Sequence, residues 1–210
     1  MAARYELDQN SFIHVQRTMD NIEGDMSLMN EAELIRHNRY SDNKKRKEFL
    51  AGRTLIKTEM STLLGIKPTE VVISLSENGK PYCQQEGENP VHFNLSHGSG
   101  HFVIAFSLHP IGVDLEKKRE VSFEEMQPIL SKLESQQLAE LSDKDRSRAI
   151  LSLFTTKEAF IKSTDKKYGL DEIGFSLSEG YWKLKSPEVK CTFQHIEHKE
   201  LIIAVSVYLG

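Results

Sequence analysis

The feature that most constrains the fold is a helical pattern followed by strand-like segments, which occurs twice, once in each half of the chain. Similar apolar strands begin at His101 and Leu201, about one hundred residues apart. Apolar strands also resemble each other by chance, so this likeness alone is a weak sign of duplication. The repeated order predicts one α+β body of two α/β halves, each with a helix against a mostly antiparallel sheet. We expect the boundary near Pro110, which gives domains 1–110 and 111–210.

Periodicity and turn residues predict the elements of each half. In residues 42–64, an apolar stripe includes Phe49, Ile56 and Met60, and Gly65 ends the helix. Asn78-Gly79 is typical of a hairpin turn. The other expected helices are 31–40, 123–126, 129–141 and 146–162, and the expected strands are 11–19, 71–75, 91–96, 102–108, 111–116, 175–177, 181–184, 192–196 and 201–208.

The composition argues against several classes of protein. A net charge of −4, from 27 basic and 31 acidic side chains, argues against a dedicated nucleic-acid binder. No stretch of about 18 apolar residues is present, so we expect no membrane span, and the first residues lack the apolar core of a secretory signal. Cys83 and Cys191 have no spacing typical of a disulfide scaffold or a zinc site. We therefore expect a cytoplasmic, monomeric protein.

Asp114 and Glu116 alternate with apolar residues in the strand 111–116. Side chains two apart on a strand share a face, so both carboxylates point one way while Val113 and Leu115 enter a core. Two carboxylates on one face repel each other unless a cation lies between them, and hard oxygen ligands suit Mg²⁺. A solvated acidic face explains the same alternation and is the commoner reason for it.

Glu158 and Lys162 lie four residues apart on the expected helix 146–162, so their side chains are neighbours on one face. A surface ion pair is one interpretation. The other is a carboxylate that binds a metal or accepts a proton, beside a cation directed at phosphate oxygens.

Ser96 and His97 end a strand and precede the loop 98–100. Because neighbours on a strand face opposite sides, they do not form a Ser–His dyad with each other. An imidazole beside a glycine-containing loop suits a phosphate, whereas a hydrogen-bonded histidine at a strand end is the plain alternative. Arg53 lies within an apolar stripe and therefore needs an anionic partner. The basic run 36–47 is either a solvated helix face or a surface for phosphates or an acidic partner.

Taken together, these segments resemble the 4′-phosphopantetheinyl transferases, specifically the larger, surfactin-synthetase-activating (Sfp-like) class. The matching stretches, in order, are Phe49–Arg53, Gly79–Pro81, Phe93–His97 with Ile111–Glu116, and Phe154–Lys162. The resemblance implies two similar halves of about 100 residues packed as a pseudo-dimer. It also implies transfer of phosphopantetheine from coenzyme A to a serine of an apo acyl- or peptidyl-carrier protein, with release of 3′,5′-adenosine bisphosphate. One alternative is a magnesium-dependent nucleotide pyrophosphate hydrolase. Another is a non-enzymatic module that binds carrier proteins or nucleic acid.

The resemblance further implies roles for the acidic residues and for one lysine. Asp114, Glu116 and Glu158 match residues that hold Mg²⁺, or Mn²⁺, against the pyrophosphate of coenzyme A. Glu158 also matches the base for the incoming serine hydroxyl. Lys162 matches a lysine that binds the pyrophosphate, neutralises its charge and assists the leaving group.

The remaining expected site residues concern coenzyme A itself. His97 and Arg53 match residues that grip its phosphates, and His97 takes part in catalysis by neutralising their charge. Lys80 and Ser96 fall where the family lines the nucleotide pocket, and Lys157 is expected to bind coenzyme A as well. Basic contacts upstream of Arg53 have three candidates, which are Arg36, Arg39 and Lys44.

The chain departs from the family pattern at three places. Phe154 stands where the family usually has Trp, Gly98 where it often has Ser, and the segment 163–170 where a glycine-rich loop commonly follows. The segment 117–130 is expected to touch the carrier protein through its lysines and an apolar patch that contains Phe123. Core packing of a short helix explains the apolar residues equally well.

Overall fold

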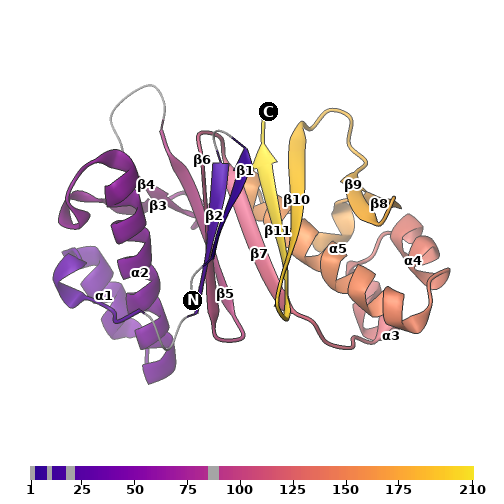
Figure 1. Cartoon of the computed structure of the whole chain (residues 1–210), viewed down its shortest axis with the longest axis horizontal. Coiled ribbons are helices and arrows are strands. Elements are labelled where there is room, and N and C mark those ends of the chain that lie inside the picture. The colour runs from indigo at the N-terminus through magenta and orange to yellow at the C-terminus, as the bar shows by residue number, and fades with distance from the viewer. Residues whose placement is uncertain (1–2, 9–10, 18–21, 85–89) are drawn as a thin grey trace.

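Two long helices enclose two antiparallel sheets in four layers, in the order helix, sheet, sheet, helix (Figure 1). The computed structural model describes residues 3–8, 11–17, 22–84 and 90–210. The helices are α1 (Glu31–Arg39), α2 (Asn43–Leu64), α3 (Phe123–Met126), α4 (Lys132–Ala139) and α5 (Asp143–Thr164). The strands are β1 (Ala3–Asp8), β2 (Ser11–Arg17), β3 (Ile73–Leu75), β4 (Pro81–Cys83), β5 (His92–Gly98), β6 (His101–Ser107), β7 (Ile111–Lys117), β8 (Phe175–Ser178), β9 (Tyr181–Leu184), β10 (Cys191–His198) and β11 (Leu201–Tyr208). None of the helices in the described ranges is long and apolar enough to cross a bilayer.

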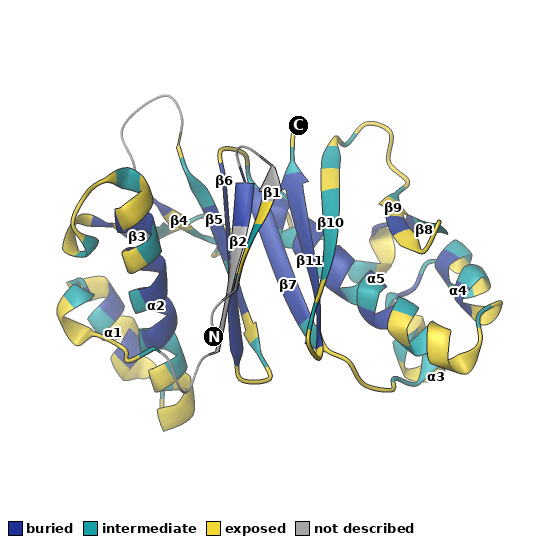
Figure 2. Ribbon diagram, viewed as in Figure 1, coloured by how far each residue is buried: buried dark blue, intermediate teal, exposed yellow. Residues whose placement is uncertain are grey.

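The first sheet has the order β1-β2-β6-β5, and all of its pairs are antiparallel. Every residue of β6 is buried, as Figure 2 shows. Because successive side chains on a strand face opposite sides, β6 contributes to two cores. Phe102, Ile104 and Phe106 pack with the apolar stripe of α2, whereas Val103 and Ala105 face the second sheet.

The second sheet has the order β10-β11-β7 and is also antiparallel. Val113 and Leu115 of β7 point toward β6 and join Val103 in the core between the sheets. The opposite face of β7 and β11 packs against α5. The α+β prediction, with one long helix against an antiparallel sheet in each half, is therefore confirmed.

The two halves repeat one topology with an offset of 100 residues. β2 starts at Ser11 and β7 at Ile111, α2 spans 43–64 and α5 spans 143–164, and β6 starts at His101 and β11 at Leu201. The sheet order β2-β6-β5 in the first half corresponds to β7-β11-β10 in the second. Both long helices end in a left-handed residue, Gly65 with φ 67° and Asp165 with φ 52°. The fold is thus a duplicated unit with two halves packed sheet to sheet.

A buried lysine anchors each long helix to the short helix beside it. In the first half, Lys57 Nζ lies 2.9 Å from Oε2 of Glu33 and donates to the Leu28 carbonyl. In the second half, Lys157 Nζ lies 2.7 Å from Oε2 of Glu134. Both glutamates are the third residue of their short helix and complete a capping box at its N-terminus. The buried pair is therefore a duplicated structural element.

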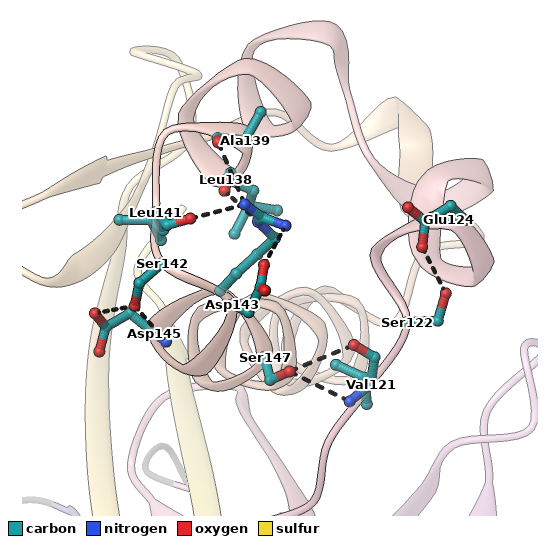
Figure 3. Close-up of polar contacts among 11 residues, drawn as sticks. Val121, Ser122, Glu124, Leu138, Ala139, Leu141, Ser142, Asp143, Asp145 and Ser147 are labelled. Carbon is teal, nitrogen blue, oxygen red and sulfur yellow. Dashed lines mark hydrogen bonds and ion pairs between the residues drawn. The ribbon is translucent and has the colours of Figure 1, made fainter.

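Differences between the expected and observed elements have local causes. The expected helix 129–141 is reduced to α4, because the segment with Pro128 forms a 3₁₀ turn (Gln127–Ile129) and Ser131 caps α4. α5 begins at Asp143 rather than at residue 146, because the Ser142 side chain accepts a hydrogen bond from the Asp145 amide (Figure 3). β1 was not expected, and residues 18 and 19 of the first expected strand lie outside the described residues.

Candidate active site

A cavity of about 460 Å³ lies between α1, α2 and β5. Its lining includes the basic side chains Arg36, Lys45, Arg53 and His97. The Phe49 ring lies close to two guanidinium groups, with the Cζ atoms of Arg36 and Arg53 5.5 and 5.4 Å from its centroid. Guanidinium and ammonium groups bind phosphates strongly. The cavity therefore suits an anionic ligand that carries phosphate groups.

Arg53 is the most deeply buried of these basic residues, with 6% of its surface exposed. Its Nε lies 3.6 Å from Oε1 of Glu33, whose other oxygen pairs with Lys57. Within the described residues, neither Arg53 Nε nor Glu33 Oε1 makes a hydrogen bond. A buried donor without a hydrogen-bond partner is costly, and an anion in the cavity would relieve that cost.

The cavity has a counterpart of about 430 Å³ in the second half, beside α5, β9 and β10. Eight lining positions of the first cavity recur 100 residues later, namely 45, 48, 49, 52, 81, 95, 97 and 102. The charges differ, because Asp145 replaces Lys45 and Glu197 replaces His97, while Arg148 replaces Glu48. Of these two cavities, the one in the first half has more basic than acidic lining residues and suits phosphates, whereas the second has more acidic than basic ones.

Ser96 and His97 face opposite sides of β5, as the strand pattern predicts. Ser96 Oγ donates a 2.9 Å hydrogen bond to Oδ1 of Asp114. The His97 ring lines the cavity and packs edge-on against Phe102 at a centroid distance of 5.6 Å. These neighbouring residues thus connect the basic cavity with the carboxylates on β7.

Asp114, Glu116 and Glu158, here called the carboxylate group, come together where α5 crosses β7. α5 approaches β7 closely because residue 112 is glycine. A Cβ at Gly112 would lie 2.0 Å from the Ala159 carbonyl oxygen and 2.5 Å from the amide nitrogen of Ser163. The contact brings the α5 side chains beside the face of β7 that carries Asp114 and Glu116.

Lys162 lies among these carboxylates. Its Nζ is 2.6 Å from Oδ1 of Asp114 and 3.9 Å from Oε2 of Glu158. The expected pairing of Glu158 with Lys162 is therefore present, but the closer partner of the ammonium is Asp114. Glu116 has a looser partner in Arg119, at 3.7 Å.

The carboxylates affect one another electrostatically. Burial, and then the neighbouring Asp114 carboxylate, raise the pKa of Glu116 above its ordinary value. Burial raises the pKa of Glu158, the Lys162 ammonium opposes that rise, and Asp114 adds to it. A raised pKa brings a glutamate closer to what a general base needs near neutral pH.

The donor set fits a divalent cation, although the groups are not yet arranged around one. Glu116 and Glu158 have raised pKa values, and Asp114 contacts Lys162. All three carboxylates supply the hard oxygen atoms that Mg²⁺ and Mn²⁺ prefer. No cluster of three His, Cys, Asp or Glu side chains in the described part of the chain is gathered as a metal site. In the present arrangement, the Lys162 ammonium is the cation that bridges Asp114 and Glu158.

Lys80 and Lys157 lie away from the basic cavity. Lys80 Nζ donates to the carbonyl oxygens of Ile111 and Ser163, where β7 meets the end of α5, and burial lowers its pKa to about 8. Lys157 is completely buried and donates to Glu134 and to the carbonyls of Ile129 and Leu170. With all three N–H groups engaged, Lys157 cannot reach a ligand, so the geometry does not support its expected contact with coenzyme A.

The segment 117–130 is anchored to the second half more than expected. Its apolar side chains, Phe123, Met126 and Ile129, pack against the C-terminal core. The backbone of Val121 exchanges two hydrogen bonds with the Ser147 hydroxyl of α5 (Figure 3). Core packing, the alternative noted for this segment, is what the structure shows for the apolar residues.

Sequence reasoning missed three residues that shape the site. Lys45 lines the cavity, and its spacing to Phe49 and Arg53 is the i, i+4, i+8 signal of a shared helix face. Asn94 Oδ1 accepts from the Val113 amide at 2.9 Å and joins β5 to β7. Gly112 permits the close contact with α5. Of the three upstream candidates, Arg36 alone is among the residues that line the cavity.

Two family models show to which superfamily this chain belongs. The family model for the N-terminal domain of 4′-phosphopantetheinyl transferase matches residues 16–109, and the model for the 4′-phosphopantetheinyl transferase superfamily matches residues 110–205. Together they span nearly the whole chain, and the chain belongs to this superfamily. The predicted resemblance is confirmed.

Relatives of known name agree with this assignment. The 4′-phosphopantetheinyl transferase ffp of Bacillus subtilis is 34% identical over 143 residues, which cover 66% of this chain and 62% of the relative. Sfp of Bacillus subtilis strain 168 is 30% identical over 128 residues, or 61% of this chain and 56% of the relative. HetI of Nostoc is 30% identical over 153 residues, which cover 70% of this chain and 64% of the relative. The chain thus matches somewhat less than two thirds of the length of these relatives.

Proposed function

We propose that this protein transfers the 4′-phosphopantetheine group of coenzyme A to a serine hydroxyl of an apo acyl- or peptidyl-carrier protein. The observation that carries the proposal is the pairing of a basic cavity with the carboxylate group across the β5/β7 junction. Ser96 contacts Asp114 on one side, and His97 lines the cavity on the other. Membership of the superfamily supports the same activity.

The first half binds the nucleotide part of coenzyme A. Arg53, Arg36 and Lys45 supply the positive charge for its phosphates, and His97 contributes from β5. Phe49 offers an aromatic wall beside two guanidinium groups. The second half supplies the reacting groups, so the proposal assigns coenzyme A binding to residues 1–110 and catalysis to residues 111–210.

Glu158 accepts the proton of the serine hydroxyl as the oxygen attacks the phosphorus that carries the pantetheine arm. The bond from that phosphorus to the bridging oxygen of the pyrophosphate breaks, and 3′,5′-adenosine bisphosphate leaves. Lys162 neutralises charge on the pyrophosphate oxygens, which is what this in-line displacement requires. The raised pKa of Glu158 suits a base that must hold the proton during the step.

Asp114, Glu116 and Glu158 would hold a Mg²⁺ or Mn²⁺ ion. When bound, the ion neutralises charge on the non-bridging oxygens of the pyrophosphate. The residues of the chain orient this group, because Ser96 fixes Asp114 and the Gly112 contact fixes the distance between β7 and α5.

A cytoplasmic location and a monomeric state go with this proposal. Both cysteines, Cys83 and Cys191, are thiols, as in a reducing compartment. Both halves of the site come from one chain, so a second copy is not needed to complete it. The carrier protein and coenzyme A are then the partners, with no nucleic acid and no membrane involved.

The test is a product balance for the protein incubated with coenzyme A, Mg²⁺ and an apo carrier protein. We expect the carrier to gain the mass of one phosphopantetheine group, matched mole for mole by 3′,5′-adenosine bisphosphate. A carrier whose acceptor serine is replaced by alanine should yield neither product. Release of free phosphopantetheine at the same rate without any carrier would instead establish the pyrophosphate hydrolase.

A further inference from the structure

Lys162 occupies the point where two carboxylates from different elements converge. Its Nζ lies 2.6 Å from Asp114 on β7 and 3.9 Å from Glu158 on α5. A divalent ion bound to these two carboxylates would need the same space and would be repelled by the ammonium. The position that a metal would take is therefore filled by a cation of the chain itself.

The surroundings of Lys162 permit this ammonium to leave. Its side chain is 29% exposed and stands on a flexible four-carbon stem. Lys157, five residues earlier on the same helix, is fully buried and is held by three acceptors. The chain thus contains one fixed lysine and one displaceable lysine within a short stretch of α5.

Asp114 stays in place whether or not Lys162 leaves. Ser96 Oγ donates to the same oxygen, Oδ1, that accepts from Lys162. Asp114 is also largely buried, which limits its side-chain freedom. Departure of the ammonium would therefore uncover a preorganised carboxylate oxygen rather than a disordered one.

We propose that Lys162 acts as a built-in counter-ion that keeps the metal position filled until a pyrophosphate arrives. A free divalent ion competes poorly, because moving Lys162 away costs its contact with Asp114. A pyrophosphate gives the ammonium a new anionic partner, so metal and nucleotide bind cooperatively. This inference rests on the proposed function for the metal position and for the identity of the nucleotide.

The test measures Mn²⁺ binding by electron paramagnetic resonance, without any carrier protein, after subtraction of Mn²⁺ held by the nucleotide alone. For the unmodified protein, we expect coenzyme A to tighten Mn²⁺ binding at least tenfold. The nucleotide 3′,5′-adenosine bisphosphate, which lacks a pyrophosphate, should have little effect on the affinity for Mn²⁺. Equal effects of the two nucleotides would overturn the inference, and this comparison requires no variant.

The variant Lys162→Met should bind Mn²⁺ about tenfold more tightly than the unmodified protein when no nucleotide is present. Lys183→Met is the matched control, because Lys183 forms an exposed i, i+4 pair with Glu179 at 3.6 Å and its loss removes the same charge. Mn²⁺ binding by Lys162→Met no tighter than by the control would contradict the inference. This binding experiment contains no carrier protein, so its failure would not argue against phosphopantetheine transfer by the unmodified protein. Conversely, a protein that transfers no phosphopantetheine could still show the expected Mn²⁺ binding.

Discussion

The contact between α5 and β7 at Gly112 gives the most demanding prediction about how the site is assembled. An alanine at this position would place a Cβ 2.0 Å from the Ala159 carbonyl oxygen and 2.5 Å from the Ser163 amide nitrogen. Both atoms belong to the backbone, so no side-chain rotation relieves the clash. The helix must retreat from the strand by about 1 Å to restore ordinary contact distances.

Two measurable losses follow for Gly112→Ala. Overpacking of this kind costs about 1–3 kcal/mol, which for a chain of this size lowers Tm by roughly 2–10 °C. Displacement of Glu158 and Lys162 by about 1 Å relative to Asp114 should reduce kcat about 10²-fold. The KM for coenzyme A should change less than kcat, because the basic cavity is lined by α1, α2 and β5 and not by α5.

Thermal unfolding by circular dichroism and a steady-state transfer assay measure these two effects. Gly174→Ala is the matched control, because a Cβ there would meet its nearest atom, Cβ of Lys185, at 4.0 Å. If Gly112→Ala matches Gly174→Ala in both Tm and kcat, the close contact does not position the carboxylate group, and this part of the reasoning is refuted.

Three further predictions concern the cavity and the junction between the halves. Arg53→Ala should raise the KM for coenzyme A about 10–100-fold with a small change in kcat. The KM for dephospho-coenzyme A should respond less to this substitution, and equal losses with both substrates would place Arg53 elsewhere. Calorimetry should give one coenzyme A per chain, because acidic residues outnumber basic ones in the lining of the second cavity. Two equivalent sites would contradict the charge argument. Lys80 has a pKa of about 8 in the folded protein and an ordinary value of 10.5, so between these pH values the unfolded chain binds more protons than the folded one. The free energy of unfolding, measured relative to Lys80→Met, should therefore rise as pH increases above 8. Urea unfolding on both sides of pH 8 checks this, and a flat or falling difference would refute it.

Much of the fold could be predicted because its signals are local. The apolar stripe around Phe49 and the alternation in 111–116 give the correct helix and the correct faces of the strand. The Asn78-Gly79 signal is confirmed by the hairpin of β3 and β4, with φ 87° at Gly79. The start of α5 was placed too late because its cap, Ser142, precedes the apolar pattern.

The site residues were predictable where residue type and local spacing indicate their role, but their contacts with distant elements were not. Asp114 and Glu158 were expected to act together, and the structure brings them to one lysine. The interpretation of Lys157 failed because its partner Glu134 lies on another helix, 23 residues earlier. The link from Ser96 to Asp114 crosses between the two sheets and has no signature in either strand alone.

The central claim is that Glu158 removes the proton from the attacking serine. The most direct test is the pH profile of single-turnover transfer, read by intact mass of the carrier, for the unmodified protein and Glu158→Gln. A base must be ionised, and burial and Asp114 raise the pKa of Glu158, so activity of the unmodified protein should fall with decreasing pH at a value above 4.5, the ordinary value for a glutamate.

For Glu158→Gln, we expect coenzyme A to bind normally while transfer falls about 10²–10⁴-fold, the usual contribution of a general base, with partial recovery as hydroxide increases at high pH. A glutamine variant that transfers at a near-native rate, with an unchanged acid limb, would contradict the account and leave Glu158 as the partner of a surface ion pair.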